Sequence, residues 1–111
     1  RFRISKYSSQ ILSLSNISNV QPGDSFNFQI SLVNITLGPI SFAIVNFTID
    51  FGNNTIISSN ITDNNGIAQY LIDVPLNATQ LNITIYYAGN STFKATIYNV
   101  NKYQKIKMMD S

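Results

Sequence analysis

The chain contains no cysteine, histidine, glutamate or tryptophan among its 111 residues. Without cysteine it forms no disulfide, so thiol content does not place it inside or outside a cell. The missing histidine and cysteine remove the commonest general base, the thiolate nucleophile and the usual ligands of zinc and copper. The acidic residues are scattered aspartates, without the paired spacing that glycoside hydrolysis uses. We therefore expect no enzyme activity, no metal and no cofactor.

Charge is also scarce, at 11% of residues, and basic charge lies only near the two ends. The basic residues are Arg1, Arg3, Lys6, Lys94, Lys102, Lys105 and Lys107. Between Tyr7 and Phe93 the chain has aspartates alone, so a mildly acidic body separates two basic ends. Nucleic-acid binding needs a concentrated basic face, and we expect no such partner. The basic ends are either solvated termini or specific charge contacts.

Long hydrophobic runs are missing as well. No apolar stretch approaches the ~18 residues of a spanning helix, so we expect no membrane span in this segment. The chain opens on Arg1 rather than Met, and we interpret it as a processed or excised segment, which leaves room for a signal peptide ahead of Arg1. Its 44% hydrophobic residues are ample for a single core and argue against disorder.

What the chain does contain is apolar and polar residues in alternation, the pattern of half-buried strands. We expect strands at 11–18 (weak), 25–33, 41–51, 55–61, 67–74, 81–88 and 93–100. Turn signals separate them, among them Pro22-Gly23-Asp24 and Gly38-Pro39. No window has a helical period, and about seven short strands with regular turns indicate an all-β, antiparallel sandwich.

The expected domain organisation is a sandwich at residues 10–100 with a terminal segment on each side. Residues 1–9 are an N-terminal extension, either a linker or an exchanged strand. Residues 101–111 are a C-terminal tail or an added strand. Each segment has weak alternation, and we expect four apolar residues to serve assembly by adding to a neighbouring copy. They are Phe2, Ile4, Ile106 and Met108.

The stretch Asp63-Asn64-Asn65-Gly66 is a tight hairpin signal, because Asn and Gly tolerate positive φ. It also faintly resembles the start of a calcium-binding loop. The position where such a loop has its bidentate acid is Ile72, however, and a hairpin turn explains the residues fully.

Two short motifs resemble the Ig-like repeats of bacterial and archaeal surface proteins: TDNNGIAQY at residues 62–70 and YAGNSTF at residues 87–93. That family commonly has a T-D-x-x-G-x-A hairpin and later a Y-x-G-[ND]-x-x-[YF] turn before its last strand. In these motifs Gly66 and Gly89 allow tight turns, and Tyr87 and Phe93 close one end of the sandwich. The resemblance implies an Ig-like sandwich that acts as a stacking or spacer module at a cell surface, including archaeal glycosylated filaments, pili and S-layers. It assigns no ligand.

Eight Asn-x-Ser/Thr triplets, called sequons below, are acceptor motifs for N-glycosylation. Their asparagines are Asn16, Asn34, Asn46, Asn53, Asn60, Asn77, Asn82 and Asn90. Fifteen asparagines in this composition would give roughly three such triplets by chance. We interpret the excess as N-glycosylation; the alternative is AT-rich codon usage that raises Ile, Asn and Thr together. Asn46 and Asn82 fall on outward positions of expected strands, and Asn53 and Asn90 fall in turns, where a sugar meets least resistance.

Together these features favour a non-catalytic, heavily N-glycosylated extracellular structural module of a cell-surface filament, S-layer or adhesin stalk. Its expected partners are copies of itself or adjacent domains, with covalent N-glycans. The alternative is a glycan- or protein-binding adhesion module that uses Tyr86, Tyr98 and Tyr103. For these tyrosines the competing interpretation is cross-strand packing.

Overall fold

The computed structural model describes residues 6–103, and this part of the chain is built from strands alone. The strands are β1 (Gln10–Ser13), β2 (Ser25–Asn34), β3 (Gly38–Pro39), β4 (Ile44–Asp50), β5 (Thr55–Ile61), β6 (Ile67–Asp73), β7 (Gln80–Tyr87) and β8 (Thr96–Tyr103). With no helix between residues 6 and 103, this part of the chain contains none that is long and apolar enough to cross a membrane. The predicted all-β class is confirmed.

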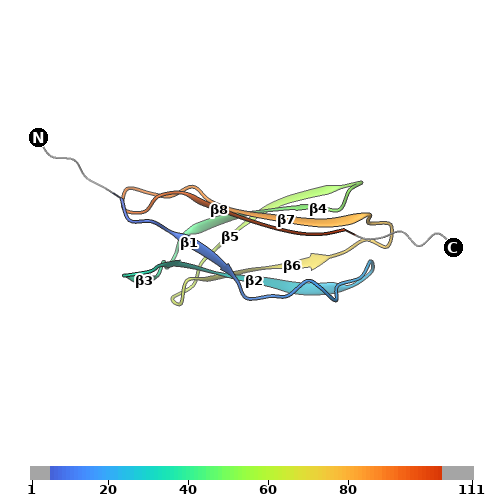
Figure 1. The fold of residues 1–111 in the computed structure, drawn as a ribbon, viewed down its shortest axis with the longest axis horizontal. Coiled ribbons are helices and arrows are strands. Elements are labelled where there is room, and N and C mark those ends of the chain that lie inside the picture. Colours follow the sequence, from blue (N-terminus) through green and yellow to red (C-terminus); the bar gives the residue numbers. More distant parts are fainter. Residues whose placement is uncertain (1–5, 104–111) are drawn as a thin grey trace, which may run out of the picture.

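Two antiparallel sheets stack face to face, as the predicted sandwich requires (Figure 1). One has the order β1-β2-β3, with β6 also paired to β2, and the other has the order β5-β4-β7-β8. The two-residue strand β3, at the Gly38-Pro39 turn signal, was not expected from the sequence. The expected strand ends at 93 and 100 are shifted, since β8 runs from Thr96 to Tyr103.

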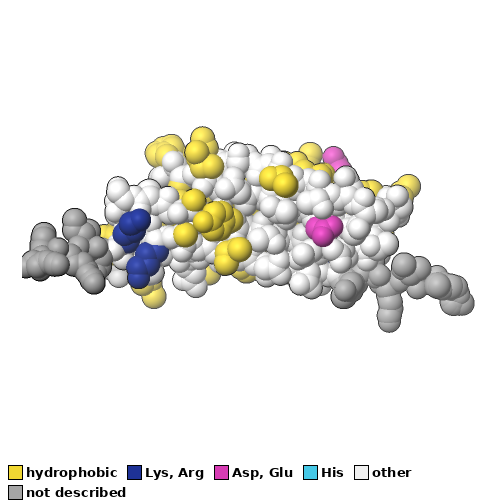
Figure 2. Space-filling view, turned by 90° about the horizontal axis from the view of Figure 1, so that it is seen from above, with side chains coloured by type: hydrophobic (Ala, Val, Ile, Leu, Met, Phe, Trp, Pro, Cys, Tyr) yellow, Lys and Arg dark blue, Asp and Glu magenta, His cyan; other side chains and the backbone are white. Residues whose placement is uncertain are grey.

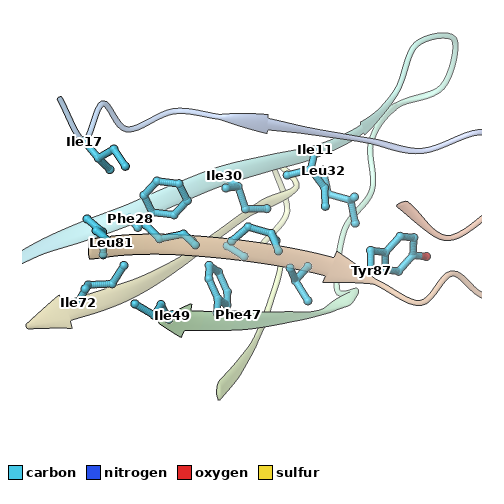
Figure 3. Close-up of a cluster of buried hydrophobic side chains, with 14 of the residues drawn as sticks. Ile11, Ile17, Phe28, Ile30, Leu32, Phe47, Ile49, Ile72, Leu81 and Tyr87 are labelled. Carbon is cyan, nitrogen blue, oxygen red and sulfur yellow. The ribbon is translucent and has the colours of Figure 1, made fainter. Parts of the chain in front are cut away.

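The core lies between the sheets and follows from alternation along β2, β4 and β7. In β4, Val45, Phe47 and Ile49 are fully buried, while Asn46 and Thr48 between them stay half exposed. The labelled core side chains of β2, β4 and β7 converge between the ribbons in Figure 3. Burying a large apolar side chain contributes about 1.5–3 kcal/mol, so this shared core is the main stabilising term.

Strands β4 and β7 occupy the middle of their sheet and pair antiparallel. Their register puts Phe47 opposite Ile85 on the core side. One residue further along, the outward Thr48 faces the outward Thr84. Because side chains alternate strictly between faces, this register also fixes which polar residues reach the outer face.

The turn at residues 62–66 has the predicted local chemistry but not the predicted topology. The Asp63 carboxylate oxygen Oδ1 accepts backbone N–H groups of Asn65 and Ile67 at 2.8 and 3.0 Å, and Gly66 has φ +74°. However, β5 pairs with β4 and β6 pairs with β2, so the turn joins the two sheets. The hairpin prediction is wrong, because turn residues specify a chain reversal and not the strand that each arm pairs with.

Residues 7–9, predicted to belong to the N-terminal extension, run along the sandwich. Tyr7 forms a parallel bridge with Phe93, in which the Tyr7 N–H donates to the Thr92 carbonyl at 2.9 Å. The Lys94 N–H donates back to the Tyr7 carbonyl at 2.8 Å. The Tyr7 and Phe93 rings also lie 6.1 Å apart, and Phe93 packs against the core. Phe2, Ile4, Ile106 and Met108, the four residues assigned to assembly, lie outside the described residues.

The described chain enters and leaves at opposite ends of the long axis (Figure 1). Tyr7 lies beside the segment that precedes β8. At the other end of β8, Tyr103 pairs with Gln80, the first residue of β7. Neighbouring chain segments on the two sides of the module therefore continue from opposite ends.

Gly66 in the turn at residues 62–66 and Gly38 at the start of β3 allow a matched comparison of two glycine substitutions. A Cβ on Gly66 would lie 2.7 Å from the Leu32 carbonyl oxygen and 2.9 Å from Pro39 Cβ, whereas Gly38 has nothing within 4 Å. Both have positive φ, so Gly38→Ala should lose about 1–2 kcal/mol from backbone strain alone. Gly66→Ala should lose about 1–3 kcal/mol more from the clash. Urea unfolding of the two variants measures the difference, and equal losses would contradict the packing of Gly66 against β2.

Candidate functional site

All eight sequon asparagines lie within the described residues, and they differ in exposure. Asn16, Asn53, Asn60, Asn77 and Asn90 are exposed. Asn46 and Asn82 are half-buried on the outer face of the β5-β4-β7-β8 sheet, where the alternation of their strands predicts them. Asn34 differs from the others, because only 4% of its surface is exposed.

Asn34 is a structural residue in this fold. Its Nδ2 donates to the Ser8 carbonyl at 2.8 Å, and its Oδ1 accepts the N–H groups of Thr36 and Leu37 at 2.8 and 2.7 Å. The side chain thus holds the N-terminal segment and the turn after β2 together. An N-linked sugar would replace a hydrogen of a buried amide, and Asn34 is therefore not a candidate in the folded chain. Its position in the alternation, in step with Leu32, was the signal that could have shown this.

On the outer face of the β5-β4-β7-β8 sheet, side-chain amides form a network around Asn82. The Nδ2 of Asn99 donates to Asn82 Oδ1 and to Thr84 Oγ1, each at 2.9 Å. Asn82 is thus held through its oxygen. Its Nδ2, the atom to which an N-linked sugar bonds, makes no hydrogen bond within residues 6–103. This arrangement orients Asn82 and leaves the reactive nitrogen available.

Two sequon asparagines in loops, Asn16 and Asn90, also accept hydrogen bonds through the side-chain oxygen. Asn90 Oδ1 accepts the N–H groups of Thr92 and Phe93 at 2.7 and 2.8 Å, and Asn16 Oδ1 accepts the Ser18 N–H at 2.9 Å. Such Asx-type bonds are common where asparagine shapes a turn. They leave Nδ2 free for a covalent sugar.

Asn53 and Asn60 instead use Nδ2 as a donor. Asn53 Nδ2 donates to the Asn77 carbonyl at 3.0 Å, and Asn60 Nδ2 donates to the Gln69 carbonyl at 2.5 Å. A side-chain amide nitrogen carries two hydrogens, so one remains after a sugar is attached. Because both side chains are exposed, these bonds are compatible with modification.

Thr62, the hydroxyl residue of the Asn60 sequon and the first residue of the TDNNGIAQY motif, is a core residue, a role that its motif did not indicate. It is 1% exposed, its Oγ1 donates to the Ile40 carbonyl at 2.8 Å, and the Ala43 N–H donates to the same oxygen at 2.9 Å. The sequon needs this hydroxyl. A sugar on Asn60 therefore has to be added before Thr62 becomes buried.

None of the outward positions within β1, β2 and β6 is a sequon asparagine. The outward side chains on this face include Leu12, Leu14 and Leu71, which are 42%, 51% and 55% exposed. Between them the Gln29 and Gln69 side chains are joined by a 2.8 Å hydrogen bond. Among outward strand positions, sequon asparagines thus occur on the β5-β4-β7-β8 sheet and not on the β1-β2-β6 sheet.

The three tyrosines that the alternative adhesion module would use have different surroundings. Tyr86 is on the outer face and is 41% exposed. Tyr98 packs against the core, so its expected role as an exposed platform is wrong, because β8 turns this position inward. The side chain of Tyr103 lies outside what the structure describes.

Near Tyr86, the outer face of the β5-β4-β7-β8 sheet is apolar at one end. The exposed residues there are Phe42, Ile44, Ile57, Ile61, Tyr86 and Ile97. Figure 2 views the molecule from the side on which β4, β7 and β8 lie, and hydrophobic side chains gather over one half of it. Asn46 lies within this apolar end, directly opposite Tyr86.

Tyr87 closes the same end of the sandwich from inside, as its motif predicted. It is 3% exposed, and its hydroxyl points away from the other labelled core side chains (Figure 3). That hydroxyl has no hydrogen-bond partner within the described chain. Desolvation by burial raises the pKa of the Tyr87 phenol above its ordinary value of 10.0.

Among the described residues, no group of three or more possible metal ligands lies together. Comparisons of the chain with protein-family models and with curated proteins find no match. The functional argument therefore depends on the fold and on the placement of the sequons.

Tyr87→Phe tests the state of the buried hydroxyl. An unsatisfied buried hydroxyl costs about 1–3 kcal/mol, so removing it at pH 7 should leave stability unchanged or raise it by about 1 kcal/mol. Above pH 10 the unfolded tyrosine loses its proton while the folded one keeps it, which lowers the free energy of unfolding of the wild type. The variant lacks this loss, so its advantage should grow between pH 9 and 11 in urea unfolding. A marked loss of stability at pH 7 would show that the hydroxyl has a partner.

Proposed function

We propose that this chain is a non-catalytic, N-glycosylated structural module of an extracellular surface assembly such as a filament, S-layer or adhesin stalk, with an Ig-like β-sandwich. The observation that carries the proposal is the placement of the sequons. Seven of the eight asparagines are exposed or half-buried. Two of them, Asn46 and Asn82, occupy outward strand positions of the β5-β4-β7-β8 sheet, whereas no outward position within β1, β2 or β6 is a sequon asparagine. Chance codon usage gives no reason for acceptors to avoid one face.

Edge protection supports the same role. β5 is an edge strand of its sheet and exposes Ile57 and Ile61 at 75% and 55%. An exposed apolar edge is a template for unwanted strand pairing, and natural proteins block such edges with polar or bulky groups. Sugars on Asn53, in the turn before β5, and on Asn60, within β5, would shield this edge. In a chain with so little charge, carbohydrate would supply bulk that keeps strand edges apart.

The direction of the chain supports a module in a linear assembly. The described chain enters and leaves at opposite ends of the long axis (Figure 1). Neighbouring domains or copies would therefore follow one another in line. The outer face of the β1-β2-β6 sheet, which presents Leu12, Leu14 and Leu71 and no sequon asparagine at an outward strand position, remains available for lateral contacts between copies.

One observation favours the second candidate, a glycan- or protein-binding adhesion module. The apolar end of the opposite outer face exposes Tyr86 beside several isoleucines. Electron microscopy of native material and a glycan array separate the two functions. Ordered fibres or lattices support the structural module, and glycan binding by a chain that does not assemble supports the adhesion module.

Intact mass spectrometry of the protein from its native source tests the glycosylation directly. We expect the native mass to fall by several glycan increments when the N-glycans are removed chemically. The control is the same chain produced in a host without N-glycosylation, whose mass of 12.4 kDa the treatment should leave unchanged. A native mass that the treatment does not change would contradict the proposal, because the edges and outer faces would then be uncovered.

A further inference from the structure

A groove of about 400 Å³ opens on the outer face where β4 begins and β7 ends. Paired residues of β4 and β7 end with Asn46 and Tyr86. The segment that precedes β4 lies next to the residue that follows β5, since the Phe42 N–H donates to the Thr62 carbonyl at 2.9 Å. On the other side β7 ends and the chain turns at Gly89, which has φ +83°. The divergence of the two segments creates the groove.

Phe42 borders this groove in an unusual state. Its φ of +56° makes it the one non-glycine residue with positive φ among the described residues, and its side chain is 71% exposed. A bulky residue in this conformation is strained, and such strain is concentrated at functional positions. The buried Thr62 hydroxyl, bonded to both Ile40 and Ala43, holds the segment around Phe42 in place. The fold thus maintains an aromatic ring in a strained and solvated position, which a ligand on the ring would explain.

Two sequon asparagines, Asn46 and Asn90, line the groove from its two sides. Asn46 lies on the same face of its strand as Ile44 and next to Tyr86 of β7. The side-chain amide of Asn46 makes no hydrogen bond within residues 6–103. The side-chain oxygen of Asn90, by contrast, accepts two backbone N–H groups of its own turn. Asn46 is therefore the acceptor whose substituent is free to lie along the groove.

We propose that the groove seats the first sugar of an N-glycan attached to Asn46, with the apolar face of the sugar ring packed on Phe42. The inference rests on the proposed glycosylation and adds the place where one glycan docks. A pocket with an aromatic wall and a few amide groups has the chemistry that a sugar needs, since the ring stacks and the hydroxyls bond. Tyr87 also lines the groove, but its hydroxyl is buried in the sandwich, so the contact with the sugar is assigned to Phe42.

A double-mutant cycle in a host that glycosylates the chain tests the docking. The four proteins are the wild type, Phe42→Gly, Asn46→Gln and the double variant, compared by melting temperature. Without the Asn46 glycan, Phe42→Gly should leave the melting temperature unchanged or raise it, because glycine adopts positive φ without strain. With the glycan present, the same change should lower it, and the two shifts should differ by about 4 °C or more.

The control is Leu71→Ala, an exposed apolar position on the opposite sheet, whose effect should be the same with and without Asn46. Equal effects of Phe42→Gly in both backgrounds would overturn the docking. Coupling of Phe42 to Asn90→Gln instead would overturn the assignment to Asn46. Glycopeptide masses keep the two proposals apart: a bare Asn46 beside occupied sequons refutes the docking alone, and a fully bare chain refutes the glycosylation as well.

Discussion

The packing of the central pair β4 and β7 over the opposite sheet is the constraint on which the rest of the molecule depends. Phe47, Ile49, Ile83 and Ile85 are completely buried in that contact. Because side chains alternate along a strand, burying these residues places the intervening ones on the outer face. The same hydrophobic contact that stabilises the sandwich therefore presents Asn46 and the neighbouring polar residues to solvent. A shift of one residue in either strand would exchange core and surface.

Alternation made most of this fold predictable. It gave the all-β class, the outward placement of Asn46 and Asn82, and strand bounds that match closely for β5 and differ by one residue at the C-terminal ends of β2 and β6. The pairing of the strands was harder to predict from the sequence. Asp63 and Gly66 specify a chain reversal, but they do not specify which sheet the next strand joins. The bridge of Tyr7 with Phe93 joins segments far apart in the sequence, and no local sequence pattern predicts it.

The candidate site was also predictable only in part, because local signals are visible in the sequence and tertiary packing is not. A sequon is a local signal, so all eight were visible, but whether an asparagine is available depends on packing. Asn34 is used by the fold to bind Ser8, and Thr62 supplies a core hydroxyl to a sequon whose asparagine is exposed. Phe42 was hidden for a different reason. Its exposure depends on a positive φ that only the three-dimensional course of the chain reveals.

Site-by-site glycopeptide mass spectrometry of the native protein is the most direct test of the central claim, that sandwich packing decides which asparagines carry sugar. We expect glycans on Asn46 and Asn82, the two acceptors that the core contact turns outward, and an unmodified Asn34. A sugar on Asn34, or bare asparagines at both outward strand positions beside occupied loops, would contradict the claim.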